Sequence, residues 1–284
     1  MNKIENIDEL AKIANKIRKD LIRMLVASGS GHSAGPLGMA DIFTALYFNI
    51  MNHDPEDPLW EDRDRLFLSN GHIVPIRYAV MAHADYFPAS KLKTLRKFGS
   101  DLQGHPERVR MPALESTSGP LGSGLAQAAG YAYAARMDER RFRVFAALSD
   151  GELNAGNSWE AFLFAGKNKL SNLTAFIDRN NIQIDGFTES VMPLEPLEEK
   201  FKSFNWHVLH IDGHNFREII DSVGHARAVY EKPSVIIAHT IPGKGVDFME
   251  NRFEWHGKSP NAEEAKEALH ALRTLGGKIK GEHE

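Results

Sequence analysis

The second half of the sequence repeats one pattern, in which a short apolar run is followed by a helical pattern. The apolar runs are typical of buried strands, and the segments between them carry apolar residues at helical spacing. The runs lie at 143–149, 173–178, 206–211 and 234–239, and the helical patterns at about 157–169, 197–204 and 215–231. Strands that alternate with helices form a mainly parallel sheet. We therefore expect an α/β fold, a doubly wound sheet with helices on both faces.

The first half of the sequence predicts helices joined by a glycine-rich turn. Residues 5–27 form an amphipathic helical pattern, and Pro36 is well placed to open the next helix. Residues 49–65 are polar and contain two prolines, which is typical of a surface connection. We expect residues 1–284 to form a single domain, with the amino-terminal helix and the residues from about 278 as extensions.

Composition and charge argue against several classes of protein. The 284 residues carry 34 Lys+Arg against 38 Asp+Glu, so the formal net charge of −4 gives no bulk attraction to nucleic acid or to a membrane surface. The absence of cysteine removes disulfides, thiolate metal sites and cysteine nucleophiles, and it fits a reducing compartment. The apolar runs are too short to span a bilayer. We expect a cytoplasmic protein with no nucleic-acid or membrane partner.

Polar residues follow two neighbouring strands of the predicted sheet. Asp150 and Gly151 come directly after one strand, and Asn180 follows the next strand along the chain. Because the carboxyl ends of parallel strands meet at one edge of a sheet, we expect Asp150 and Asn180 to project toward one point. A carboxylate, an amide oxygen and a backbone carbonyl form a shell that suits Mg²⁺ completed by a bound phosphate. By themselves these are also ordinary turn residues, so that interpretation stays open.

Turns that contain glycine supply the other candidates. Segment 115–124 is glycine-rich and leads into a helical run of small residues, where a ligand has access to the backbone. Four histidines lie beside glycine on predicted turns, namely His32, His72, His105 and His256. One such histidine is more often a surface residue, but four together favour a polar site whose groups titrate near neutrality. Three further histidines lack a shared face and do not predict zinc, namely His207, His210 and His214.

Together these motifs resemble the amino-terminal, thiamine-diphosphate-binding domain of transketolases. The resemblance covers nearly the whole chain in the order of the family. The matching segments are 31–32, 38–41, 62–65, 68–72, 104–107, 117–124, 150–151 with Asn180, and 255–257. The resemblance implies thiamine diphosphate as the cofactor and Mg²⁺, or Ca²⁺ or Mn²⁺ in its place, as the metal.

The resemblance also implies which residues hold the diphosphate and its metal. Asp150, Asn180 and the backbone carbonyl of Ile182 correspond to the metal ligands of the family. Gly151 and His72 correspond to residues that meet the diphosphate. We therefore expect these five residues to surround one metal and one diphosphate group.

Other residues correspond to the family's pyrimidine and substrate contacts. The backbone of Gly119 and Leu121 would border the aminopyrimidine ring of the cofactor. His32, His105 and His256 resemble histidines that line the substrate channel and bond the sugar hydroxyls, with His256 also near the diphosphate. Together with the histidine at the diphosphate, these three are expected to be catalytic.

The resemblance extends to one domain of a transketolase and implies a split enzyme. A separate C-terminal transketolase subunit would carry the pyrimidine-binding domain and its catalytic glutamate, and two copies of each chain would form a heterotetramer. The expected reaction transfers a two-carbon ketol unit from a ketose phosphate to an aldose phosphate. In this reaction the protein orients the cofactor and excludes water, while the cofactor supplies the chemistry.

Two departures from the family motif and two alternative functions stay open. Ser149 stands where the motif usually has its first glycine, which is a small change. Ala155 stands where a glutamate often follows at the subunit interface, although Glu160 is present, so communication between two sites is in doubt.

The alternatives are the α subunit of a 2-oxo-acid decarboxylating enzyme and a non-catalytic regulatory subunit of the same fold. The glycine-flanked histidines favour sugar chemistry.

Overall fold

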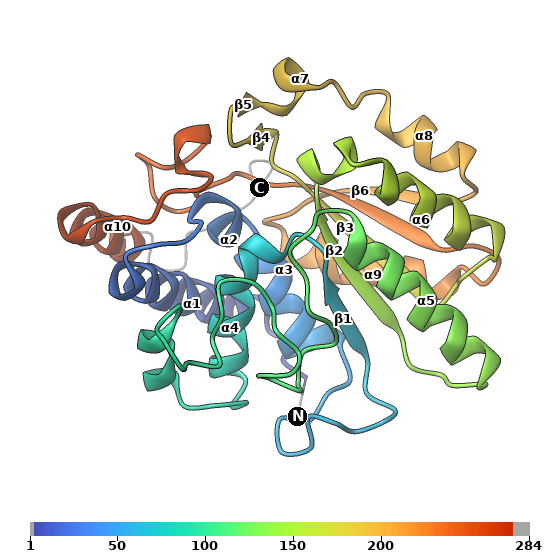
Figure 1. Ribbon diagram of the computed structural model, residues 1–284, viewed down its shortest axis with the longest axis horizontal. Coiled ribbons are helices and arrows are strands. Elements are labelled where there is room, and N and C mark those ends of the chain that lie inside the picture. Colours follow the sequence, from blue (N-terminus) through green and yellow to red (C-terminus); the bar gives the residue numbers. More distant parts are fainter. Residues whose placement is uncertain (1–2, 275–284) are drawn as a thin grey trace.

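A computed structural model describes residues 3–274 and contains a five-stranded parallel sheet (Figure 1). The strands are, in spatial order, β1 (Arg65–Leu68), β2 (Val144–Ser149), β3 (Leu173–Arg179), β7 (Ser234–His239) and β6 (His207–Asp212). Every neighbouring pair is parallel. The predicted mainly parallel sheet is confirmed, and its strands begin and end within about one residue of the four apolar runs.

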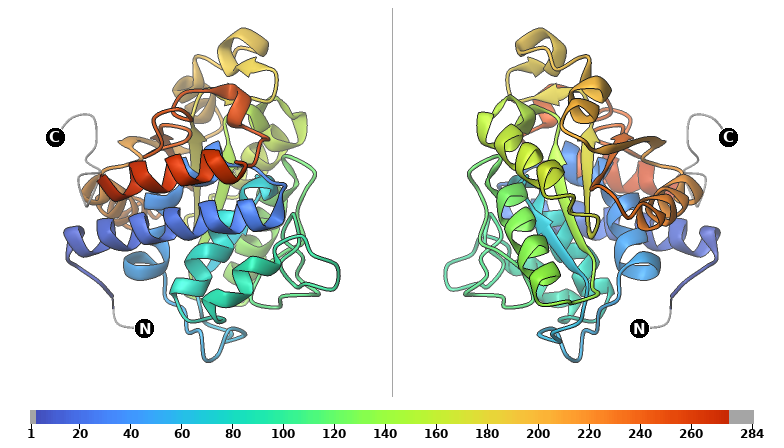
Figure 2. Two further views of the ribbon diagram at one scale, coloured as in Figure 1. Left: turned by 90° about the vertical axis from the view of Figure 1, so that its left-hand side faces the viewer. Right: turned by 90° about the vertical axis from the view of Figure 1, so that its right-hand side faces the viewer.

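Helices cover both faces of this sheet, as predicted (Figures 1 and 2). One face carries α1 (Ile7–Ser28), α3 (Ala40–Ala45), α4 (Val74–His83), α9 (Phe216–Ala228) and α10 (Ala262–Thr274). The other face carries α5 (Ser123–Met137), α6 (Gly156–Lys167) and α8 (Leu197–Ser203). Figure 2 shows α1 and α10 side by side on the outside of the first layer, and α5 beside α6 on the second.

Two hydrophobic cores form because strand residues alternate between the faces. In β2, Phe145 and Ala147 belong to the core under α1, α3 and α4, whereas Val144 and Ala146 belong to the core under α5 and α6. Both sets are buried, so the strands are apolar along their whole length, as a sheet covered on two sides requires. The helix α1 is part of the first core, since Leu10 and its apolar neighbours are fully buried.

The amino-terminal helices differ from the prediction at Pro36. The second helical segment is broken into α2 (Ala34–Gly38), α3 and a π-helical turn, Leu46–Ile50. Pro36 is the third residue of α2 and does not open it, so that prediction is wrong. Proline is tolerated there because the first N–H groups of a helix have no partner inside the helix. The expected extension from about residue 278 lies outside the described residues.

The remaining elements are short and connect the main ones. They are the 3-10 turns Gly71–Ile73, Ala89–Thr94, Gly151–Asn154 and Phe253–Trp255, the antiparallel hairpin β4 (Ile182–Gln183) and β5 (Gly186–Phe187), and α7 (Thr188–Val191). The hairpin and α7 project beyond the sheet near the carboxyl ends of its strands (Figure 1). Across residues 3–274 the structure contains no helix that is both long and apolar enough to cross a membrane.

Candidate active site

The candidate site lies at the carboxyl ends of β1, β2 and β3. In the register of β2 and β3, Ser149 pairs with Asp178, so Asp150 and Asn180 leave neighbouring strands at almost the same level. The backbone N–H of Asp150 also donates to the carbonyl oxygen of Asp178 at 3.1 Å. The backbone then turns through Asn181, whose φ of 62° is a left-handed conformation that asparagine tolerates. This turn directs the backbone N–H of Asn181 at the carboxylate of Asp150.

A cavity of about 350 Å³ at this edge brings most of the predicted site residues together. It is lined by His32, His72, His105, His256, Gly119, Leu121, Gly151 and Ile182, with Ser149, Glu152, Gln183, Ile184 and Asp185 beside them. Segments that are far apart in the sequence therefore meet at one place. The two remaining predicted residues, Asp150 and Asn180, do not line the cavity and are 0% and 4% exposed.

Three of the histidines form a compact cluster. The ring centroid of His32 lies 4.8 Å from that of His72 and 5.5 Å from that of His256, and the rings of His72 and His256 are 5.2 Å apart. His105 lines the same cavity but is more exposed than the other three. The Nδ1 atoms of His32 and His256 are buried and have no hydrogen-bond partner within the described residues. Such atoms are suited to bonding a ligand.

Burial determines the protonation of this cluster. Burial, with a smaller effect of the charge on His256, lowers the pKa of His32 to about 4. Burial also lowers the pKa of His72, His105 and His256. The expectation of groups that titrate near neutrality is corrected here, because burial disfavours the charged form of each ring. Neutral rings each offer one donor and one acceptor nitrogen, which suits the hydroxyl groups of a sugar.

Asp150 is held by a dense set of hydrogen bonds. Its Oδ1 accepts from the backbone N–H of Gly151 at 2.7 Å, and its Oδ2 accepts from the backbone N–H of Asn181 at 2.8 Å. Arg179 donates from Nη1 to the same Oδ2 at 3.0 Å. Burial raises the pKa of the Asp150 carboxyl, and Arg179 and the two N–H groups oppose this shift. Sequence reasoning missed Arg179, although it directly precedes Asn180.

The amide of Asn180 is oriented by its two neighbours. Its Nδ2 donates to Asp178 Oδ2 at 2.8 Å, and its Oδ1 accepts from the backbone N–H of Ile182 at 3.1 Å. Asp178 also accepts from the hydroxyl of Thr240, and burial raises the pKa of this carboxyl to about 7. The amide oxygen is thereby directed toward Ile182, whose carbonyl is the third predicted metal ligand.

These residues fit a hard divalent cation that is completed by a phosphate. The donor set is one carboxylate, one amide oxygen and one backbone carbonyl, and Mg²⁺ prefers oxygen ligands of this kind. Among residues 3–274, no group of three or more His, Asp or Glu side chains is placed to hold a metal by itself. The other ligands must therefore come from water or from a bound diphosphate. The unpartnered histidine nitrogens in the adjoining cavity are consistent with a bound organic ligand.

A buried glutamate that sequence reasoning missed fixes the wall of the cavity. Glu152 is fully buried and accepts hydrogen bonds from the hydroxyl of Ser69, from the backbone N–H of Gly122 and, at 3.2 Å, from the backbone N–H of Ser149. Burial raises the pKa of its carboxyl, and these three donors oppose the shift. The three donors belong to the end of β1, the glycine-rich segment and the end of β2, so one side chain joins three walls.

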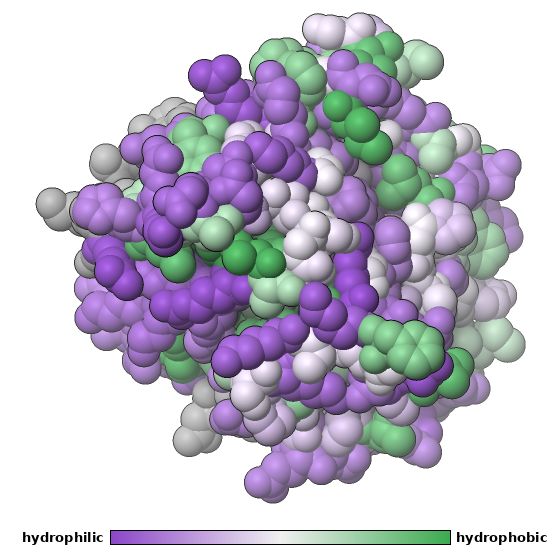
Figure 3. All heavy atoms as spheres, turned by 60° about the vertical axis from the view of Figure 1, so that its left-hand side comes forward, coloured by the Kyte–Doolittle hydropathy of each residue, from purple (hydrophilic) through white to green (hydrophobic). Residues whose placement is uncertain are grey.

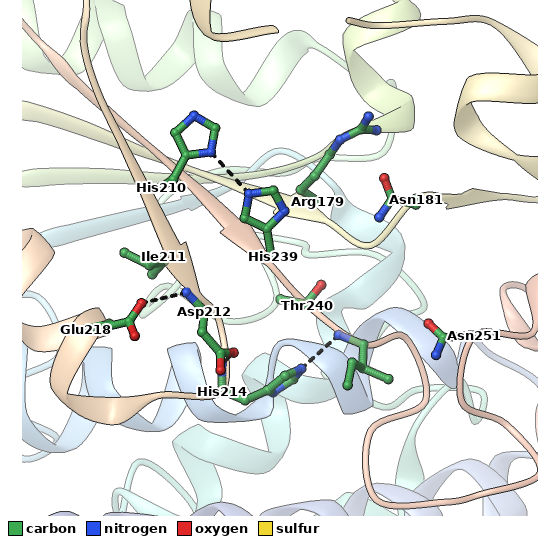
Figure 4. A pocket seen from close by; sticks show the side chains of 11 residues that line it. Arg179, Asn181, His210, Ile211, Asp212, His214, Glu218, His239, Thr240 and Asn251 are labelled. Atoms are coloured by element: carbon green, nitrogen blue, oxygen red, sulfur yellow. Dashed lines mark hydrogen bonds between the residues drawn. The ribbon is translucent and has the colours of Figure 1, made fainter. Parts of the chain in front are cut away.

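A second cavity of about 500 Å³ lies at the carboxyl ends of β3, β6 and β7 (Figure 4). Within it, His210 Nδ1 and His239 Nε2 are 3.1 Å apart. His214 is buried, with its Nδ1 2.8 Å from Asp41 Oδ2 and its Nε2 accepting from the backbone N–H of Ile241. Of the three histidines for which we predicted no zinc site, His210 and His214 line this cavity and His207 does not.

Comparison with known proteins identifies the family. The model of the transketolase thiamine diphosphate binding domain matches residues 10–276. The chain belongs to the transketolase family. It is 41% identical over 268 residues to the 6-deoxy-6-sulfo-D-fructose transketolase subunit of a Clostridium species, covering 94% of this chain and 98% of that relative. It is 37% identical over 263 residues to an apulose-4-phosphate transketolase subunit from Phocaeicola vulgatus, covering 93% of each chain.

Solved structures agree with this assignment. The transketolase of Campylobacter jejuni superposes with a TM-score of 0.89 at 33% identity, covering 94% of this chain and 43% of that one. This chain therefore spans less than half of the length of the transketolase in that structure. The predicted fold, the transketolase-type transferase class and thiamine diphosphate as the cofactor are confirmed by the family. The 2-oxo-acid decarboxylating and regulatory alternatives are not favoured.

Proposed function

We propose that this chain transfers a two-carbon ketol unit between sugar phosphates, together with a C-terminal transketolase subunit. The observation that carries this proposal is the single cavity that His32, His72 and His256 line together with Gly151 and Ile182, which lie one and two residues after the buried Asp150 and Asn180. A diphosphate site and a set of sugar-binding donors are both needed for this reaction. Chain and partner together would act in the cytoplasm, a location supported by the lack of cysteine.

In this proposal the loops after β2 and β3 hold the cofactor. Asp150, Asn180 and the carbonyl oxygen of Ile182 bind Mg²⁺, or Ca²⁺ or Mn²⁺ in its place, while Gly151 and His72 contact the diphosphate. A Cβ at Gly151 would lie 2.9 Å from Gln183 Cγ, so any larger residue there would displace the side chain of Gln183. When bound, thiamine diphosphate supplies the carbon nucleophile of the reaction.

The glycine-rich segment would position the other end of the cofactor. Gly119 and Leu121 line the cavity and would border the aminopyrimidine ring through their backbone groups. Glu152 holds this segment through its hydrogen bond from Gly122. We infer that Glu152 keeps the ring contacts at a fixed distance from the diphosphate contacts, since the same carboxylate also binds the end of β2 through Ser149.

The histidines would bind the sugar and move its protons. The unpartnered Nδ1 atoms of His32 and His256 are free to accept a proton from a sugar hydroxyl and to return it. Their lowered pKa keeps them neutral near pH 7, so each ring is ready to accept. His105 lies at a more exposed position of the same cavity, where it would contact an incoming sugar. These roles make the histidines the catalytic residues of this chain.

Exposed apolar side chains support a partner chain. On α5 and α6 they are Tyr131, Met137, Leu163 and Phe164, and around the β4–β5 hairpin and α7 they are Ile184, Phe187, Val191 and Met192. The side of the molecule that Figure 3 presents is mostly hydrophilic, with hydrophobic residues in small separate groups. A protein interface buries apolar side chains such as these at its centre. We propose that a C-terminal subunit with a pyrimidine-binding domain covers them, in a heterotetramer with two copies of each chain.

The sugar itself is proposed by its chemistry. One relative is named for 6-deoxy-6-sulfo-D-fructose and another for apulose-4-phosphate, so both named sugars carry an anionic group. We propose a ketose phosphate donor and an aldose phosphate acceptor for this chain. A ketose that carries a sulfonate in place of the phosphate should be tested beside it as a donor.

The test is ketol transfer by both purified chains mixed with thiamine diphosphate and Mg²⁺. A panel of ketose phosphates, one sulfonated ketose and several aldose acceptors should give product with at least one pair. The variant His32→Ala should lower kcat by about 10²-fold or more, because it removes a proton acceptor. Cofactor binding without transfer from any ketose would contradict the proposal, and decarboxylation of a 2-oxo acid would replace it.

A further inference from the structure

The guanidinium of Arg179 lies among three carboxylates. Arg179 is the last residue of β3, and its side chain is buried. Its Nη1 donates to Asp150 Oδ2 at 3.0 Å, while its Nη2 donates to Glu189 Oε1 at 2.6 Å and to Glu195 Oε1 at 2.9 Å. Asp150 is also the carboxylate that would bind the metal under the proposed function. One buried carboxylate therefore has two candidate cations.

We propose that Arg179 is a built-in counter-cation of Asp150, which the divalent metal displaces when it binds. This inference rests on the proposed function, since it concerns the same metal site. A buried carboxylate without a positive partner is costly, so Asp150 needs a cation before the metal arrives. Two cations at one buried carboxylate repel each other strongly, because little water screens them. The ion pair between Arg179 and Asp150 must therefore be broken when the metal binds, and this cost weakens metal binding.

The surroundings of Arg179 provide another position for the displaced guanidinium. Glu189 and Glu195 have half-exposed side chains. Both can therefore stay bonded to Arg179 after its guanidinium has left Asp150, and neither carboxylate has to be buried. Arg179 also lines the second cavity, next to its register partner His239 on β7 (Figure 4). This cavity of about 500 Å³ gives the side chain room to move away from Asp150.

The charges of the cluster match this exchange. Three carboxylates and one guanidinium leave two negative charges, which equals the charge that a divalent cation neutralises. Arg179 is thus a positioning residue. It would not contact substrate, but it would set the concentration of metal at which the site of Asp150 is filled. The distance from Asp150 to the guanidinium is that of an ordinary ion pair, so the exchange has a definite free-energy cost.

The first experiment measures metal affinity in the chain assembled with its partner subunit. Metal-free protein with saturating thiamine diphosphate is titrated with Mn²⁺, and free Mn²⁺ is counted by electron paramagnetic resonance. Arg179→Gln should bind Mn²⁺ about tenfold more tightly than the wild type, because a charge-assisted hydrogen bond no longer opposes the metal. The same variant should unfold at a lower temperature without metal, and added Mn²⁺ should close much of that gap. Unchanged or weaker Mn²⁺ binding would overturn the proposal.

A second variant separates contact from charge. Arg179→Lys keeps the positive charge but lacks the planar fork that reaches Asp150 and both glutamates at once. Displacement of a contact predicts that this variant also binds Mn²⁺ more tightly, by about threefold, which in free energy is about half of the effect of full removal. A purely long-range charge effect predicts no change, and that result would overturn the proposal even if Arg179→Gln could not be purified.

A matched control and the wild type complete the experiment. Arg140 bonds Glu61 and Asp62 on the surface, shortly before the amino-terminal end of β2, so Arg140→Gln should leave Mn²⁺ affinity unchanged. If wild-type protein binds no thiamine diphosphate with any metal, the proposed function fails. If it binds the cofactor with metal but Arg179→Gln and Arg179→Lys match the wild type, only the present inference fails.

Discussion

At the scale of single residues, the site is made of polar groups that water hardly reaches. Asp150 and Glu152 are fully buried carboxylates, and each accepts hydrogen bonds from two backbone N–H groups. Glu152 also accepts from the hydroxyl of Ser69, and Asp150 from the side chains of Arg179 and Thr188. Such groups are stable in the interior only because every oxygen has a partner. The histidines beside them avoid the cost of a buried charge in another way, because burial lowers their pKa and leaves the rings neutral.

The lowered pKa of His32 predicts a loss of stability in acid. Its pKa is about 4 in the folded chain, against an ordinary value of 6.5, so between these values the unfolded chain binds more protons. The free energy of unfolding should therefore fall as the pH drops from about 6.5 to about 4. Urea unfolding at several pH values should show a slope on the order of 1 kcal/mol per pH unit from this group. His32→Gln should flatten the slope, and an equally steep decline in the variant would contradict the assignment.

The residues of the site were predictable from the sequence to different degrees. The histidines stood out because each lies beside a glycine, and Asp150 and Asn180 stood out because each follows a strand. Glu152 and Arg179 had no such signal, since their roles depend on partners that folding brings near. The Glu152 carboxylate, for example, bonds Gly122, which is separated from it by 30 positions in the sequence.

At the scale of elements, the walls of the site depend on close packing between a helix and a strand end. The helix α5 begins at Ser123, directly after the glycine-rich segment, and its second residue is Gly124. A Cβ at Gly124 would overlap the Cα of Ser69, at the end of β1. Only glycine allows this approach, which places the glycine-rich segment against the histidine-bearing turn after β1.

Two glycines of α5 should respond in opposite ways to alanine. Gly124→Ala should lower the free energy of unfolding by about 1–3 kcal/mol, because the backbone of Ser69 must move. Gly130→Ala meets nothing within 4 Å and should raise stability by about 0.5–1 kcal/mol through helix propensity. Urea unfolding of the isolated chain measures both changes. Equal effects of the two substitutions would show that the contact with Ser69 is unimportant.

The elements themselves were predicted well where periodicity was strong. The strands and the helices α6, α8 and α9 follow apolar patterns of the expected period, and their ends agree within a few residues. The sequence predicts that Pro36 opens the helix after the glycine-rich turn, whereas α2 begins at Ala34 and the helical segment is interrupted at Met39. Gly38, the last residue of α2, packs closely against another segment: a Cβ there would lie 3.0 Å from the carbonyl oxygen of Ile241, a tertiary contact that local sequence does not reveal.

At the scale of the whole molecule, the site lies at an edge of the sheet that this chain covers only in part. The hairpin β4–β5 and α7 project there with exposed apolar side chains, and α5 and α6 carry a second exposed apolar group. The family match and the subunit-type relatives fit a chain that works with another. Assembly is therefore expected to complete the cavity.

Charges placed on α6 should prevent that assembly without unfolding the chain. Leu163→Glu and Phe164→Glu each put a carboxylate among exposed apolar residues that the partner is expected to bury. Sedimentation of the mixed chains should show a loss of the complex, while circular dichroism stays that of the wild type. Tyr230→Glu, at an exposed residue just after α9, serves as the control and should assemble normally. Normal assembly of both α6 variants would place the interface elsewhere.

The central claim is that Asp150 binds the metal that holds the diphosphate, and calorimetry of thiamine diphosphate binding to the assembled chains tests it most directly. Wild-type protein should bind the cofactor only when Mg²⁺ is present. Asp150→Ala should weaken that binding by about 10²-fold or more with the fold intact, and the exposed control Asp221→Ala should bind as the wild type does. Unchanged, Mg²⁺-dependent binding by Asp150→Ala would contradict the account.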